Sequence, residues 1–307
     1  MASNNTTGLP VTPAEQAILT TIIYSTIFSF PLTKDELWHL LLSEEKITKQ
    51  EFEKGLQALQ KQLVFREGYY CLSGHEASIT RRKKNLTEVT KKLQRARWVA
   101  EKLSVIPSIL FIGISGGLAV GDAGEKDDID MVFITKKNTL FISRFLILSL
   151  LESLGVRRRR GQHNASDTIC ANLLFDESAL SWFGEMQDVY TAREIAQMVP
   201  VFERENIYHQ FISANQWVKT FLPNVAFINP SISKESASGL EKLTLVVCMN
   251  SLFEFLARSL QMRQIKKHQT REVVKKNILA FHPNDYRFKI LKQLRLRMRQ
   301  LGLLTKF

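Results

Sequence analysis

The stretch GISGGLAVGDAGEKDDIDMVFI, residues 113–134, decides the fold of this chain. It continues an apolar run, SILFIGI at 108–114, whose composition and length predict a buried strand. The pair Gly116-Gly117 then predicts a sharp turn after that strand. Glycine tolerates backbone angles that other residues avoid, and it lets an anion come close to backbone N–H groups.

Two aspartates follow the turn after a ten-residue spacer, Leu118–Asp127. Because side chains alternate along a strand, Asp128 and Asp130 share one face and the apolar residues between and beyond them take the other. Neighbouring carboxylates repel each other, and a divalent cation removes that cost. Mg²⁺ is usually held by one or two carboxylates together with substrate phosphates. For the pair alone, a solvated acidic edge strand is the alternative interpretation.

The glycine pair, the spacer and the carboxylate pair together resemble the signature of the DNA polymerase beta-type nucleotidyltransferase superfamily. The resemblance extends over about Ile109–Glu177, where a helical run (TLFISRFLILSLLESLG, 139–155) and a further strand (TICANLLF, 168–175) complete the order of the superfamily core. The chain is also similar to a subgroup of bacterial nucleotidyltransferase-domain proteins with a helical C-terminal half.

This resemblance implies an enzyme that moves a nucleoside monophosphate from an NTP to an acceptor hydroxyl and releases pyrophosphate. It further implies two Mg²⁺ ions that orient the acceptor oxygen and neutralise charge on the triphosphate. By position, Asp128 and Asp130 would be catalytic metal ligands. The segment Ser115-Gly116-Gly117 would hold the β- and γ-phosphates.

One position departs from the superfamily pattern, which places a third carboxylate on the neighbouring strand. Strict alternation along TICANLLF puts Ile169 and Leu173 on the apolar face and turns Asn172 toward the aspartates. We therefore take Asn172 as the third catalytic candidate, although an amide is a poor base. Asp176, at the end of the strand, would reach the site only in another register. The alternative function is a catalytically weak or inactive nucleotide-binding regulator that binds nucleic acid or a protein partner.

Arginines fill residues 157–160, between the core helix and the last core strand. Guanidinium groups match phosphate oxygens in pairs, so this run is a candidate clamp for the triphosphate or for an acceptor phosphate. A solvated basic turn is the alternative interpretation.

The rest of the sequence predicts modules on both sides of this core. The expected fold class is α+β, with a small mixed-sheet nucleotidyltransferase core flanked by an N-terminal winged-helix-like domain and a C-terminal helical domain. Capping boxes at Thr33 and Thr48 open the second and third helices of the first module. The expected boundaries are a tail at 1–12, the winged-helix-like domain at 13–77, a connector helix at 78–105, the core at 106–185 and the helical domain, read as helices from Tyr190 onward, at 186–307.

Charge is distributed unevenly along a chain whose formal net charge is +12. Residues 81–104 carry nine Lys/Arg and two acids, and residues 257–307 carry fourteen Lys/Arg and two acids. Such segregation favours a polyanionic partner such as nucleic acid, while solvated helix faces are the simpler explanation. The third helix, residues 48–63, has three lysines against two glutamates, so it is a weak DNA reader and a better packing or partner element. A winged-helix DNA regulator is a third functional hypothesis.

The features that are missing from the sequence limit the cellular compartment in which the protein is expected. Three separated cysteines give no disulfide framework and no zinc motif, which favours a reducing cytoplasm. The first residues show no signal peptide, and we expect no transmembrane segment because no uncharged apolar run reaches about 18 residues.

Overall fold

The computed structural model describes residues 12–159, 161–162, 165–182, 184–228, 251–268, 273–281 and 284–303. Helices combine with a three-stranded antiparallel sheet and a six-stranded mixed sheet, so the predicted α+β class is confirmed. Of the predicted tail, only Thr12 lies within the described residues, and its side chain accepts a hydrogen bond from the Glu15 amide at the start of the first helix. Within the described part of the chain, no helix combines the length and apolarity that a membrane span needs.

The N-terminal unit has the predicted order of three helices and a hairpin. Its elements are α1 (Pro13–Ile27), β1 (Leu32–Thr33), α2 (Lys34–His39), α3 (Lys49–Ala58), β2 (Leu63–Arg66) and β3 (Tyr69–Leu72). Both predicted capping boxes are present, one between Thr33 and Glu36 and one between Thr48 and Glu51. These reciprocal bonds satisfy backbone groups at each helix start and so fix where α2 and α3 begin.

A long helix, α4 (Ala77–Leu103), leads from this unit to the larger sheet, as the sequence predicts. The sheet has the strand order β7-β4-β5-β6-β9-β8. Its strands are β4 (Ile109–Ile114), β5 (Ile129–Thr135), β6 (Ile169–Asp176), β7 (Val199–Glu203), β8 (Val273–Val274) and β9 (Ile278–Ala280). Only β5 and β6 run parallel among these neighbours, and α6 (Leu140–Ser153) supplies the crossover that a parallel pair requires.

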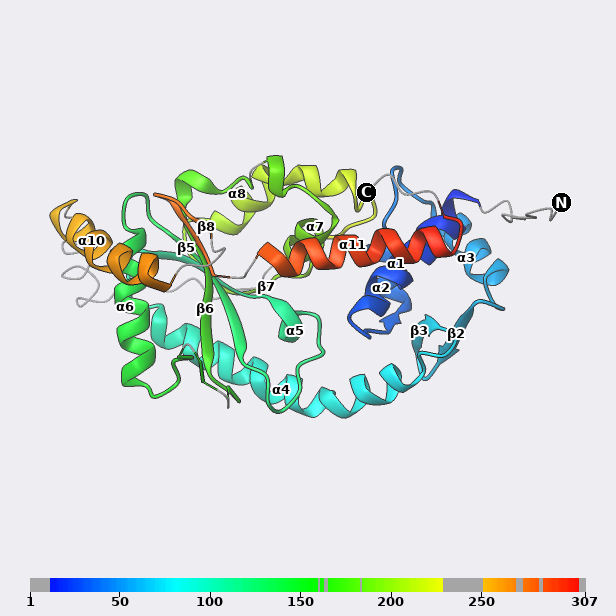
Figure 1. Cartoon of the computed structure of the whole chain (residues 1–307), viewed down its shortest axis with the longest axis horizontal. Helices are drawn as coiled ribbons and strands as arrows, with labels where there is room; N and C mark the ends of the chain where they lie inside the picture. The colour runs from blue at the N-terminus through cyan, green and yellow to red at the C-terminus, as the bar shows by residue number, and fades with distance from the viewer. Residues whose placement is uncertain are drawn as a thin grey trace.

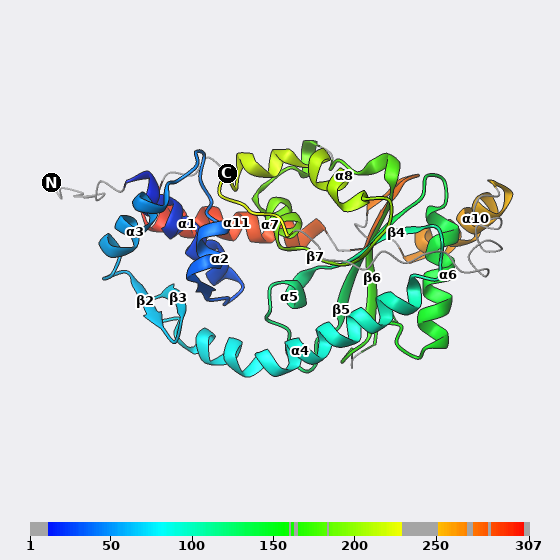
Figure 2. The ribbon, with the colours of Figure 1, turned by 180° about the vertical axis from the view of Figure 1, so that it is seen from behind.

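Helices cover both faces of the larger sheet (Figures 1 and 2). On one face, α4, α6 and α10 (Ser251–His268) pack against apolar side chains of β4, β5 and β6. On the other face lie α7 (Val189–Gln197) and α8 (Ile207–Ala214). The short elements are α5 (Gly116–Ala119) and the 3₁₀ turns η1 (Glu177–Ala179), η2 (Gly184–Met186) and η3 (Gln216–Thr220).

The helix α11 (Asn284–Gln300) crosses back and packs against α1 (Figure 1). A continuous apolar core therefore runs from α1 through α7 to α11 and on to the open face of the larger sheet. The N-terminal unit and the sheet share this core, and a cleft lies between them.

The prediction that residues 186–307 form helices alone is wrong. The strands β7, β8 and β9 belong to that region and join the core sheet. Two of them have only two or three residues and the third contains Pro200, so none shows the alternation that marks a strand in sequence. The apolar run at residues 243–260 predicts a helix; residues 243–250 lie outside the described part, and α10 continues past Leu260 to His268.

Candidate active site

The glycine turn and the second aspartate meet in the structure. The Ser115 amide donates to the Asp130 carbonyl at 3.0 Å, which brings the end of β4 against β5. Gly116 follows with φ of +64°, and a β-carbon there would lie 2.8 Å from Asp130 Oδ2. Only glycine fits this position, because any side chain would collide with the carboxylate.

The two aspartates lie close together beside a cysteine. The ligand atoms of Asp128, Asp130 and Cys170 all lie within 4.8 Å of one another. The neighbours of Asp130 on β5 alternate as predicted: Met131 packs in the core beneath α4 and α6, and Val132 packs beneath α7. Two carboxylates close together beside a glycine turn fit the oxygen ligands that Mg²⁺ requires.

The residue paired with Asp130 on β6 is Cys170, whereas Asn172 stands two residues further along and lines a neighbouring cavity with Ser115, so its catalytic role stays a prediction. The register between β5 and β6 shifts between Met131 and Val132, so β6 carries one extra residue at Asn172. Beyond this bulge the faces exchange, because inserting one residue turns every later side chain to the opposite side. Leu173 therefore packs on the aspartate side of the sheet, where alternation had predicted the opposite face.

Cys170 is a weak substitute for a third carboxylate. Its thiol is hydrogen-bonded to Asp130, and burial together with the charges of Asp130 and Asp128 raises the pKa of the thiol. A protonated thiol is a poor ligand for a hard cation such as Mg²⁺. Asp176 lies at the other end of β6, where its carboxylate accepts from the Ser178 and Asn138 amides.

The arginine run is engaged with the chain's own carboxylates. Arg158 Nε lies 3.2 Å from Asp128 Oδ2, while Arg157 and Arg159 both pair with Glu152. Arg160 lies outside the described residues. The cation nearest the site therefore neutralises one of the two aspartates.

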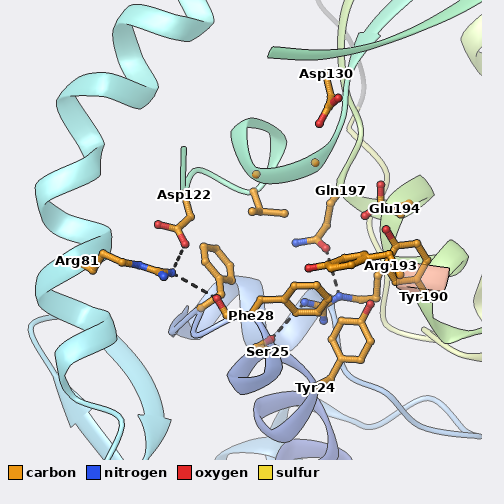
Figure 3. Close-up of a pocket in the computed structure, with 15 residues that line it drawn as sticks. Tyr24, Ser25, Phe28, Arg81, Asp122, Asp130, Tyr190, Arg193, Glu194 and Gln197 are labelled. Atoms are coloured by element: carbon orange, nitrogen blue, oxygen red, sulfur yellow. Dashed lines mark hydrogen bonds and ion pairs between the residues drawn. The ribbon is translucent and has the colours of Figure 1, made fainter. Parts of the chain in front are cut away.

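A cavity of about 470 Å³ opens in front of Asp130 and the glycine turn, within the size range of ligand pockets (Figure 3). Its far wall comes from the end of α1, from α7 and from α11. Aromatic rings form a chain along that wall, with centroids 5.4 Å apart for Tyr24 and Phe28 and 6.3 Å apart for both Phe28–Tyr286 and Tyr190–Tyr286. Such faces suit a nucleobase, since every base has a flat π-surface.

Arg81 on α4 connects the two walls of this cavity. Its guanidinium donates to the carbonyls of Phe28 and Ser29 and pairs with Asp122, which follows the glycine turn (Figure 3). The Asp122 amide in turn donates to the Gly117 carbonyl at 2.9 Å. Burial raises the pKa of Asp122, although Asn85 and Arg81 act against that shift.

The helix α7 supplies side chains that the sequence analysis missed. Tyr190, Arg193, Glu194 and Gln197 recur at helical spacing and line the cavity. Asp188 caps this helix, because its side chain accepts a hydrogen bond from the Thr191 amide. The i, i+3, i+4, i+7 pattern of polar and aromatic residues was the available signal.

Arg193 is buried beneath this wall and held by three acceptors. Its guanidinium donates to the Leu40 carbonyl at 3.2 Å, to Ser25 Oγ at 3.4 Å and to Gln197 Oε1 at 3.3 Å. Burial lowers the pKa of Arg193 to about 10, so it remains charged at neutral pH.

The side chain of Glu194 is partly buried, and it lines the cavity. Burial raises its pKa to about 7, and the charge of Asp130 adds to the shift while Arg193 opposes it. No described residue donates a hydrogen bond to its side chain. Glu194 also borders a second cavity of about 80 Å³, together with Ser115 and Asn172.

The basic segment 81–104 carries little free charge in the structure. Six of its nine cations pair with carboxylates: Arg81, Arg82, Lys83, Lys91, Lys92 and Lys102. In the segment 257–307, Arg287 pairs with Asp188 and lines the second cavity beside Tyr286. Nucleic-acid binding through either segment stays a prediction.

Comparisons with known proteins give one structural likeness. No protein-family model matches the chain, and no curated protein matches it. A crystal structure of a toxin–antitoxin with AMP-PNP aligns with 16% sequence identity and a TM-score of 0.26, covering 40% of this chain and 89% of that one. A likeness of this size does not transfer a function, which must be inferred from the residues of the cleft.

Proposed function

We propose that this protein is a Mg²⁺-dependent nucleotidyltransferase of the DNA polymerase beta type, which moves an NMP from an NTP to an acceptor hydroxyl. The observation that carries the proposal is the close approach of Asp130 Oδ2 to the Gly116 turn at the mouth of the 470 Å³ cavity. A carboxylate held there serves a cation that joins protein and triphosphate.

Different residues of the cleft bind the metal, the phosphates and the base in this proposal. Asp128 and Asp130 hold the metal, and the Ser115 hydroxyl together with the amides of Gly116 and Gly117 binds the β- and γ-phosphates. The bound Mg²⁺ supplies charge neutralisation on the triphosphate. The aromatic wall of Tyr190 and Tyr286 receives the base. Catalysis then comes mainly from positioning and from electrostatic stabilisation.

The decisive experiment incubates the protein with each α-³²P-labelled NTP, MgCl₂ and cell extract, and measures labelled product and pyrophosphate. We expect transfer by the wild type and loss of transfer in Asp130→Asn. Asp127→Asn is the matched control, because Asp127 contacts the Gly124 amide and does not line the cavity. Equal transfer by Asp130→Asn and the wild type would contradict the proposed metal role.

A second candidate function is a nucleotide-binding regulator without catalysis. It is favoured by Cys170, which stands beside Asp130 where a third carboxylate is expected, and by the pairing of Asp128 with Arg158. Calorimetry that detects Mg²⁺-dependent NTP binding, without pyrophosphate release from any NTP, would favour this candidate.

A further inference from the structure

Glu194 stands where the two cavities meet. Its side chain lines the larger cavity with Asp130 and the glycine turn, and it lines the smaller cavity with Ser115 and Asn172 (Figure 3 shows the larger). The Glu194 side chain is partly exposed on these cavities and accepts no hydrogen bond from a described residue, so its carboxylate is available to a ligand group that donates one.

The smaller cavity differs from the larger one in size and lining. Its volume is about 80 Å³, and most of its wall is apolar, including Val132, Met198 and Ala280. This volume is well below the roughly 300–1,000 Å³ of pockets that enclose drug-sized ligands, so the space suits an alcohol of a few heavy atoms better than a sugar ring or a nucleoside. Its polar groups, Ser115 and Asn172 among them, lie near the glycine turn.

We infer that the smaller cavity is the acceptor subsite, that it takes a slender alcohol group, and that Glu194 removes the proton from the acceptor hydroxyl. The inference rests on the proposed function, because it assigns the second substrate of the same reaction. It locates the missing carboxylate on α7, in place of β6 where Cys170 and Asn172 stand.

The chemical step balances with the groups present. The acceptor O–H bond breaks and its proton moves to the Glu194 carboxylate. The acceptor oxygen forms a bond to the α-phosphorus, while the bond from that phosphorus to the bridging oxygen breaks. Pyrophosphate leaves with the electron pair, and Glu194 later returns the proton to solvent.

The surroundings of Glu194 suit a base that works near neutral pH. The charged and titratable groups that face it are Asp130 on β5, Arg193 and Tyr190 on α7, Tyr24 on α1 and Tyr286 on α11. Efficient general bases have a pKa close to the working pH, and burial gives Glu194 one of about 7.

Simple alcohols test the inference without knowledge of the natural acceptor. The protein is incubated with MgCl₂, each NTP in turn and 1-propanol or glucose, and mass spectrometry measures the NMP ester, free NMP and pyrophosphate. We expect a propyl ester and no glucose ester from the wild type. Ala280→Leu, which narrows the smaller cavity, should lose the propyl ester and keep NTP affinity.

Glu194→Gln should slow ester formation about 100-fold or more while the Kd for NTP changes less than about threefold. The rate of the wild type should rise with pH through about 7, and the residual rate of Glu194→Gln should not. Glu205→Gln is the matched control, because Glu205 pairs with Lys136 at the surface.

The outcomes separate the two proposals. If the wild type releases no pyrophosphate from any NTP, the proposed function fails and this inference fails with it. If the wild type is active, Asp130→Asn is inactive and Glu194→Gln keeps the full rate and pH profile, only the role of Glu194 is overturned. Ester formation that survives in Ala280→Leu overturns the assignment of the smaller cavity.

Discussion

At residue 116 the backbone lies very close to the carboxylate of Asp130. Gly116 has a positive φ, and its missing side chain leaves room for Asp130. Gly155 has a similar φ of +67° but has nothing within 4 Å of its ideal β-carbon. Substituting each glycine in turn therefore distinguishes the effect of backbone strain, which both share, from the effect of a collision with Asp130, which only Gly116 has.

Gly116→Ala and Gly155→Ala should each cost about 1 kcal/mol of stability from the strained φ. Only Gly116→Ala should also displace Asp130, and we expect it to lower nucleotidyl transfer at least about tenfold. Thermal melts and initial rates measure both effects. Equal activity in the two variants would argue against a working contact between the turn and the carboxylate.

Glu194 should make stability depend on pH. Its folded-state pKa of about 7 lies above the ordinary value near 4.5, so the folded state binds the proton more tightly. The stabilisation is present below pH 4.5 and is lost as the pH rises toward 7. Glutamine carries no charge at any pH, so Glu194→Gln does not suffer this loss. In thermal melts without divalent metal, the melting temperature of Glu194→Gln should exceed that of the wild type by more at pH 8 than at pH 5.

The sequence could predict the position of some site residues and not of others. Gly116, Asp128 and Asp130 lie within one short segment, and the resemblance of that segment to a known signature predicted that the turn and the aspartates meet, as Gly116 and Asp130 do. Glu194 comes from a helix far along the chain, and only the fold brings it to the cavity. The helical spacing around Glu194 shows which residues share its face, but it does not show what that face meets in the fold.

Among the elements, β6 shows what a single inserted residue does. The bulge at Asn172 gives Cys170 the position beside Asp130. A strand carries no sequence mark of such a bulge, so strict alternation could not predict that Leu173 also turns to the aspartate side. Helices with capping boxes were located well because their start signals are local, while β7 to β9 were missed because they are short and depend on the sheet for their pairing.

Cys170→Asp tests this position directly. A third carboxylate beside Asp128 and Asp130 should lower the melting temperature without metal, because like charges repel in a partly buried site. It should also tighten Mg²⁺ binding, measured by calorimetry, since it adds a hard oxygen ligand. Cys170→Asn, of nearly the same shape without the charge, is the control and should show neither change.

At the scale of the whole molecule, the N-terminal unit supplies a wall of the 470 Å³ cavity. Tyr24 and Phe28 line the cavity, and Arg81 holds their helix end to the loop after the glycine turn. The winged-helix order was predictable from helix and hairpin signals. Its use as a wall was not, since it depends on the packing of α11 against α1.

Arg81→Ala should loosen that wall. We expect faster hydrogen exchange at residues 24–30 and a KM for NTP raised about threefold or more, with little change in melting temperature because exposed ion pairs contribute about 1 kcal/mol or less. Lys84→Ala, on the same helix and also exposed, is the control. An unchanged hydrogen-exchange rate in Arg81→Ala would show that the contacts of Arg81 do not hold residues 24–30 in place.

A fragment of residues 77–307 should fail to stay soluble. Removing α1 uncovers apolar side chains of α7 and α11, including Ile195, Ile290 and Leu294. Size-exclusion chromatography should find this fragment aggregated and the full chain monodisperse. A soluble, NTP-binding fragment would show that the unit is dispensable.

The position of α11 has a consequence for how the protein matures. Tyr286, on this helix, completes a wall whose other parts are translated much earlier. A ribosome that has already released the glycine turn and both aspartates still carries an open, unfinished site. If the cavity binds NTP as proposed, the protein can bind it only after residues 284–300 have emerged from the ribosome and packed against α1 and α7.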